Sequence, residues 1–76
     1  MKEQILEILT DIRPDIDFET EDGLVTNGVL ASFDIVTIVT ELSDEFDISI
    51  TPKDLVPANF DTLDGIVALV EKLSEE

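Results

Sequence analysis

The chain has 76 residues with no cysteine and no histidine, and its 19 acidic residues against four basic ones give a net charge of −15. This length allows one domain with a modest core, and an apolar content of 43% favours folding despite the charge. The composition excludes disulfides and catalysis by cysteine or histidine, and the negative charge opposes binding to nucleic acid or to anionic membranes.

The N-terminal residues lack the basic and long apolar segments of a signal peptide, and no apolar run reaches the length of a bilayer span. We therefore expect a cytoplasmic, monomeric protein without membrane insertion. Its partners should carry basic patches, because opposite charges speed the encounter of two proteins.

The first predicted helix covers residues 2–12, where apolar residues recur at helical spacing. Pro14 stops it, because the residue before a proline is pushed out of helical geometry. A long acidic connection follows over residues 15–28. Such loops are usually functional or pinned by their own apolar residues, so we expect Leu24 and Leu30 to point into the core.

The second predicted helix covers residues 32–46 and is the most clearly amphipathic segment of the chain. Its core-facing positions fall within a narrow arc of the helical wheel: Ile35, Ile38, Val39, Leu42 and Phe46. Many of its residues are β-branched and have low helix propensity, so tertiary packing must stabilise this helix.

Beyond residue 46 the apolar residues form shorter and less regular patterns. Ile48 and Ile50 alternate with polar residues but have no pairing partner, so we expect an extended segment that inserts both into the core. Residues 51–54 resemble a helix cap followed by a first-turn proline, which predicts a short third helix ended by Pro57.

Asp61 or Thr62 is the predicted cap of the last helix. Its apolar stripe consists of Leu63, Ile66, Val67, Leu69, Val70 and Leu73. The expected fold is therefore all-α: a small four-helix bundle with three main helices, one short third helix and a long first loop, forming a single domain over residues 1–76.

A calcium-binding loop is the first function to test in so acidic a chain. Asp15, Asp17 and Glu19 have the alternating spacing of such a loop. However, its sixth position is Thr20 instead of glycine, and its twelfth is Thr26 instead of glutamate. A solvated acidic loop explains these residues better. A domain this small also lacks room for a catalytic pocket, so we expect no enzymatic activity.

Ser32 lies where a turn gives way to the second helix. With no histidine or cysteine in the chain to activate it, its hydroxyl is better suited to covalent attachment than to nucleophilic catalysis. The competing interpretation is a helix cap, since serine is a preferred capping residue. Phe33 and Val36 fall outside the core arc, which is typical either of a docking surface or of packing against the long loop.

These features together resemble the acyl carrier protein family, including its peptidyl and D-alanyl carriers. The resemblance covers nearly the whole chain and centres on residues 28–34, Gly-Val-Leu-Ala-Ser-Phe-Asp, which open the second helix. Residues 41–46, Glu-Leu-Ser-Asp-Glu-Phe, match the end of that helix. The residues flanking the helix are slightly more similar to stand-alone D-alanyl and aminoacyl carriers than to fatty-acid carriers.

The resemblance implies that Ser32 carries 4′-phosphopantetheine, added from coenzyme A by a phosphopantetheinyl transferase, and that the thiol of this arm holds the cargo as a thioester. The family usually has aspartate before this serine, where this chain has Ala31, and leucine after it, where this chain has Phe33. Ala31 therefore replaces a residue that the transferase contacts in the family.

The resemblance also implies a partner-binding surface on the second helix for acyl- or aminoacyl-loading and transfer enzymes. Its expected members are Phe33, Asp34, Val36, Thr40, Glu41 and Asp44. Threonine at position 40 replaces the methionine frequent in fatty-acid carriers. Fatty acid biosynthesis, polyketide or peptide synthesis and D-alanylation are all compatible pathways, and the alternatives to a carrier are an unmodified interaction module of the same fold and an acidic ion-binding or nucleic-acid-mimicking protein.

Overall fold

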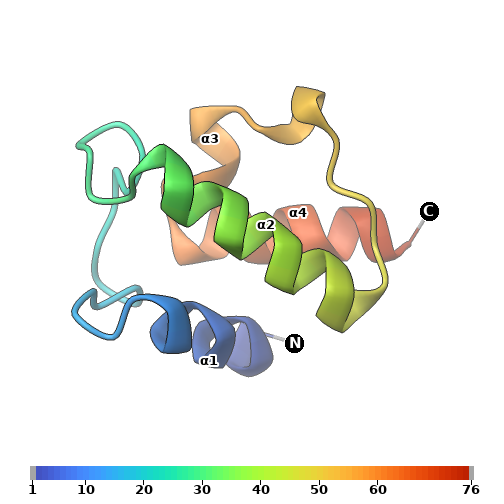
Figure 1. Ribbon diagram of the computed structural model, residues 1–76, viewed down its shortest axis with the longest axis horizontal. Helices are drawn as coiled ribbons and strands as arrows, with labels where there is room; N and C mark the ends of the chain where they lie inside the picture. The colour runs from blue at the N-terminus through green and yellow to red at the C-terminus, as the bar shows by residue number, and fades with distance from the viewer. Residues whose placement is uncertain (1, 76) are drawn as a thin grey trace.

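The computed structural model describes residues 2–75, which form four α-helices and one short 3₁₀ turn. The helices are α1 (Lys2–Ile12), α2 (Ser32–Phe46), α3 (Pro57–Phe60) and α4 (Leu63–Ser74), and the turn is η1 (Pro52–Asp54) (Figure 1). No strand occurs within residues 2–75, so the predicted all-α bundle is confirmed. The two end residues of the predicted domain lie outside the described part of the chain.

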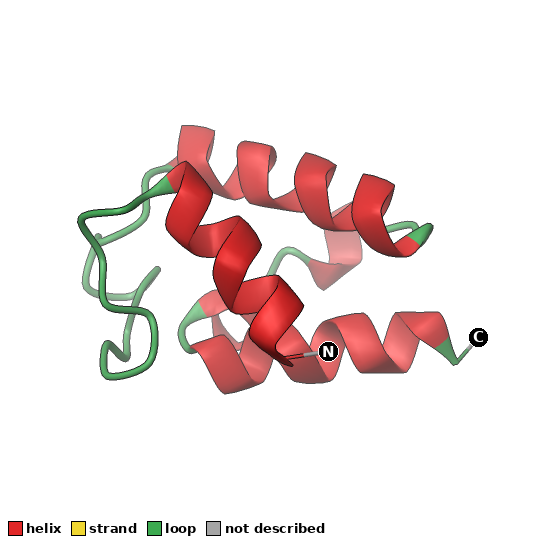
Figure 2. Ribbon diagram, turned by 90° about the horizontal axis from the view of Figure 1, so that it is seen from below, coloured by secondary structure: helices red, strands yellow, loops and turns green. Residues whose placement is uncertain are grey.

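Helices α1, α2 and α4 pack against one another, and α3 packs beside α4. Figure 2 shows α1 in front, crossing between α2 above and α4 below. The long connection between α1 and α2 forms one end of the molecule (Figure 1). The whole has extents of 30 × 24 × 19 Å, which is small enough for one shared core.

The core draws residues from every helix and from the long loop. Its buried members are Ile5, Leu9, Phe18, Leu24, Leu30, Ile38, Leu42, Phe60, Leu63, Ile66, Leu69 and Val70. The predicted inward orientation of Leu24 and Leu30 is confirmed. Ile48 and Ile50 are only partly buried and pack against the edge of this core instead of filling it.

The predicted position of the short helix is wrong. Residues 52–54 form only the 3₁₀ turn η1, closed by the Asp54 carboxylate, which accepts hydrogen bonds from the backbone N–H of Thr51 at 3.1 Å and from its hydroxyl at 3.0 Å. Pro57 does not end a helix but begins α3. A proline at the first helical position lacks only an N–H that would have no helical partner, so it is well tolerated at the start of a helix.

Of the two cap candidates for α4, Thr62 has that role. Its hydroxyl oxygen accepts a hydrogen bond from the backbone N–H of Gly65 at 2.9 Å. Asp61 lies one residue earlier and points its carboxylate at the long loop instead. Thr62 therefore fixes the start of α4, and Asp61 fixes the loop that leads to α2.

Candidate functional site

The long loop reaches α2 through a turn that requires glycine. Gly28 has a φ of +74°, a left-handed conformation that side-chain-bearing residues rarely adopt. The backbone N–H of Leu30 then bonds to the carbonyl of Leu24 at 2.7 Å, and both side chains are buried. The residues just before the candidate attachment point are therefore held against the core.

Asp61 ties this loop to the far end of the sequence. Its carboxylate accepts hydrogen bonds from the backbone N–H groups of Val25 and Thr26, each at 2.9 Å, and from the Thr26 hydroxyl at 2.7 Å. The Asp61 carbonyl also accepts a bond from the Leu24 N–H at 2.9 Å. These bonds favour the charged carboxylate and hold the pKa of Asp61 below its ordinary value, with the Thr26 hydroxyl contributing most.

Ser32 is the first helical residue of α2, and its side chain is exposed. The cap position belongs to Ala31, whose methyl group cannot accept a hydrogen bond. The interpretation of Ser32 as the helix cap is therefore wrong. The first-turn N–H groups of a helix have no partner within it, so the Ser32 hydroxyl lies exposed beside free donors and the positive end of the helix dipole.

Asp34 lies within α2, but its side chain makes one of the hydrogen bonds that cap the start of this helix. One oxygen of its carboxylate, Oδ2, accepts a hydrogen bond from the Ala31 N–H at 3.1 Å and another from Nη1 of Arg13 at 2.6 Å. Its side chain is only 15% exposed. This geometry gives Asp34 a structural role and leaves little of its carboxylate for a partner, so its predicted contact with partners stays a prediction.

Arg13 also binds Asp15 through two parallel hydrogen bonds, from Nε to Oδ1 at 3.0 Å and from Nη2 to Oδ2 at 2.9 Å. The guanidinium lowers the pKa of the Asp15 carboxyl, chiefly through these hydrogen bonds. The same bonds are the main reason that the pKa of Arg13 is raised above its ordinary value. A single arginine therefore connects the end of α1, the start of the long loop and the start of α2.

The outer face of α2 is exposed and largely apolar at its first two turns. The Phe33 side chain is 80% exposed and Val36 is 62% exposed, which places both outside the core as the helical wheel predicted. Thr40 is exposed and follows on the same side, with its hydroxyl bonded to the Val36 carbonyl at 2.9 Å. The packing alternative for Phe33 is therefore wrong, because the loop does not cover it.

Glu41 and Asp44 are exposed and continue this face toward the end of α2. Of the six predicted partner-binding residues, the structure gathers five on the outer side of the helix, and Asp34 alone turns inward. We call these five the outer face of α2: Phe33, Val36, Thr40, Glu41 and Asp44.

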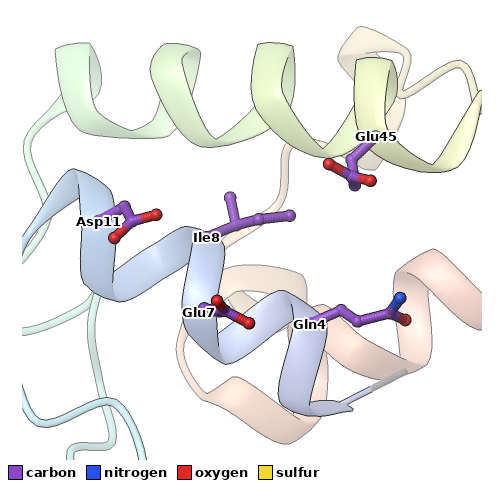
Figure 3. Close-up of a pocket in the computed structure, with 5 residues that line it drawn as sticks. All are labelled: Gln4, Glu7, Ile8, Asp11 and Glu45. Atoms are coloured by element: carbon purple, nitrogen blue, oxygen red, sulfur yellow. The ribbon is translucent and has the colours of Figure 1, made fainter.

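A hollow of the described surface lies away from this face. It is an open depression of about 300 Å³ between α1 and α2, lined by Gln4, Glu7, Ile8, Asp11 and Glu45 (Figure 3). Glu45 comes thirteen residues after Ser32 on α2, about 20 Å along the helix axis. Among residues 2–75 no group of three or more acidic side chains has an arrangement that could hold a metal ion.

None of the helices within residues 2–75 combines the length and apolar character needed to cross a membrane. Sequence reasoning singled out Ser32 and the residues of the outer face, but not the hydrogen bonds of Arg13 and Asp61 to the segments around them. The signal for Arg13 was present, because it is the only positive charge between Lys2 and Lys53. Asp61 carried no such signal, since acidic residues are abundant throughout the chain.

Three relatives of this chain are named D-alanyl carrier proteins. The chain is 32% identical over 76 residues to a D-alanyl carrier protein of Lactobacillus helveticus, covering 99% of this chain and 96% of the relative. It is 32% identical over 82 residues to the D-alanyl carrier protein of Lactococcus lactis subsp. cremoris, covering 100% and 99%. A D-alanyl carrier protein of Lactobacillus acidophilus is 30% identical over 76 residues, covering 99% and 96%. No family model matches the sequence.

Proposed function

Because this chain belongs to the acyl carrier protein family, we propose that Ser32 is the attachment site of 4′-phosphopantetheine and that the protein carries cargo between enzymes on this arm. When bound, the arm supplies a terminal thiol, which a chain without cysteine does not otherwise have. The observation that carries the proposal is the exposed Ser32 side chain at the first position of α2.

The surroundings of Ser32 fit a phosphodiester. Its side chain points into open solvent, and the free N–H groups and dipole of the first turn favour a negative group there. The chain has no histidine, and the nearest carboxylate on α2, that of Asp34, is already bonded to Arg13. We infer that the base that removes the hydroxyl proton belongs to the transferase.

The outer face of α2 is the proposed docking surface for the transferase and for loading and transfer enzymes. Phe33 and Val36 offer exposed apolar area next to Ser32, and Glu41 and Asp44 add negative charge for a basic partner. Electrostatic steering speeds arrival without requiring tight binding, which suits a carrier that must leave each enzyme. Tethering on the arm then keeps the cargo at high effective concentration.

The proposed cargo is a D-alanyl or related aminoacyl group. The relatives are named D-alanyl carrier proteins, and none of those reported is named for fatty acid biosynthesis, so that expected pathway has no support among them. Threonine at position 40, where fatty-acid carriers often have methionine, agrees with a different set of partners. A fatty acyl or polyketide cargo is the competing proposal.

The direct test is intact-protein mass after incubation with coenzyme A, magnesium and a broad-specificity phosphopantetheinyl transferase. We expect the wild-type chain to gain one phosphopantetheine group and Ser32→Ala to gain none. Since Ser32 does not cap α2, the variant should also melt at the wild-type temperature.

Ala31→Asp is the informative companion variant. It places an acceptor at the cap position of α2 and restores the residue usual in the family, so its modification should be faster than that of the wild type. If neither the wild type nor Ala31→Asp gains mass, the chain is an unmodified interaction module with the carrier fold, and the proposal fails.

A further inference from the structure

The Arg13 guanidinium links the stretch of chain just after α1 to the start of α2, near Ser32. It binds Asp15 at the start of the long loop through Nε and Nη2, and Asp34 on α2 through Nη1. The Arg13 backbone N–H bonds to the Leu9 carbonyl at 2.9 Å, which anchors the residue to the last turn of α1. Arg13 is therefore held both at its backbone and at its guanidinium group.

The link continues from Arg13 to the backbone just before Ser32. Asp34 Oδ2 accepts the bond from Arg13 Nη1 and also the bond from the Ala31 N–H. Ala31 at the cap position has no side-chain acceptor, so within residues 2–75 the bond to Asp34 is the one side-chain hydrogen bond that holds the Ala31 N–H. An arginine pinned by two bonds on one side holds the carboxylate more firmly than a lysine, whose ammonium is a single point of contact.

We propose that Arg13 is a positioning residue for the modification of Ser32: through Asp34 it fixes the Ala31–Ser32 turn in the orientation that the transferase requires. This inference rests on the proposed function, since it concerns the same serine. It adds a residue nineteen positions away in the sequence, just after α1, whose side chain bonds to Asp15 and Asp34.

Arg13 also has an electrostatic role in this arrangement. It neutralises the Asp34 carboxylate two residues from Ser32, in a chain that otherwise has no basic residue between Lys2 and Lys53. Without Arg13 that carboxylate would be a charge without its positive partner at a position that is only 15% exposed. Loss of Arg13 therefore disturbs the turn in two ways, by removing the hydrogen bond that holds the Asp34 carboxylate and by leaving its charge unpaired.

The test compares Arg13→Gln with Lys2→Gln, a matched control. Both variants lose one positive charge, but Arg13→Gln loses two ion pairs, with Asp15 and Asp34, whereas among residues 2–75 Lys2 pairs with exposed Asp64 alone, at 3.3 Å. With the transferase and coenzyme A, we expect Arg13→Gln to lower kcat about tenfold and Lys2→Gln to leave it unchanged. A change of KM common to both variants would report the net charge alone.

Two further variants separate orientation from charge. Arg13→Lys keeps the positive charge but not the two-bond pair with Asp15, so its kcat should lie between those of Arg13→Gln and the wild type. The double variant Arg13→Gln/Asp34→Asn removes the unpaired charge, but Arg13 still does not hold the Ala31–Ser32 turn. Only part of the kcat lost in Arg13→Gln should therefore return. Thermal melts of each variant establish that it is folded at the assay temperature.

Amide hydrogen exchange of the unmodified protein provides a second readout that needs no transferase. Exchange at the Ala31 N–H should rise about tenfold in Arg13→Gln and stay at the wild-type rate in Lys2→Gln. A wild-type chain that is modified at the same kcat as Arg13→Gln would overturn the inference, and so would unchanged exchange at Ala31. Failure of both the wild type and Ala31→Asp to be modified would instead overturn the proposed function, and exchange at Ala31 would still decide whether Arg13 fixes the turn.

Discussion

The two sides of α2 differ strongly in how far their apolar side chains are exposed. On the inner side Ile38 and Leu42 are completely buried, whereas on the outer side Phe33 is 80% and Val36 62% exposed. All four are apolar residues of one helix, so hydrophobicity alone does not decide which of them stabilises the fold. Their position relative to the core arc decides it.

This difference shows how a small chain can separate stability from function. A domain of this size buries only a moderate fraction of its surface, so every core position matters. Exposed apolar side chains add nothing to that burial and remain available to a partner. Substitutions on the inner side should therefore change stability, and those on the outer side should change partner binding.

Leu42→Ala should produce the largest effect. Removal of a fully buried leucine side chain leaves a cavity and costs about 2–5 kcal/mol, a large part of the stability of a small domain. Urea denaturation monitored by circular dichroism measures it, with Leu42→Met as the volume-conserving control. A midpoint for Leu42→Ala equal to that of the wild type would show that the inner side is not the stabilising one.

Asp61→Asn should have a smaller effect that depends on pH. The folded-state pKa of Asp61 is lowered, so the unfolded chain binds the proton more readily. Its stabilising contribution is therefore complete above the ordinary aspartate pKa of about 3.9 and is lost as the pH falls through the lower folded-state value.

The measurement is the difference in melting temperature between the wild type and Asp61→Asn from neutral pH to about pH 3. The variant should melt several degrees lower at neutral pH, and the difference should shrink in acid. Asp22→Asn, which removes the same charge from an exposed position of the long loop, is the control. A difference that stays constant down to the lowest pH would contradict the assigned hydrogen bonds.

Phe33→Ala should have the smallest effect on stability, within about 0.5 kcal/mol, because its side chain is exposed. The same variant should raise the KM of the transferase several-fold, since exposed aromatic residues often carry much of the energy of docking. Steady-state kinetics measures this, with Phe33→Leu as the control that keeps an apolar group. An unchanged KM in Phe33→Ala would remove this residue from the docking surface.

The sequence predicted the long elements well because burial imposes helical periodicity on them. The bounds of α1 and α2 agree with the predicted ranges of residues 2–12 and 32–46. The failures occurred where one residue type has two local uses. In the sequence, Pro57 is equally compatible with the end of one helix and with the start of another, and in the structure it starts α3.

The same ambiguity explains the errors near the site. Serine at a helix start is compatible with the cap position or the first helical position, and Ser32 takes the second. The bonds of Arg13 to Asp34 and of Asp61 to Thr26 join residues that are 21 and 35 positions apart. Such pairs depend on how the elements pack, which a local pattern does not encode.

The most direct measurement is fragmentation mass spectrometry of the unmutated chain after incubation with the transferase and coenzyme A. It locates the arm without any substitution that could disturb the fold. The account predicts one phosphopantetheine group on Ser32 and none on Ser43, Ser49 or Ser74. An arm on another residue, or a fully folded chain that gains none, would contradict it.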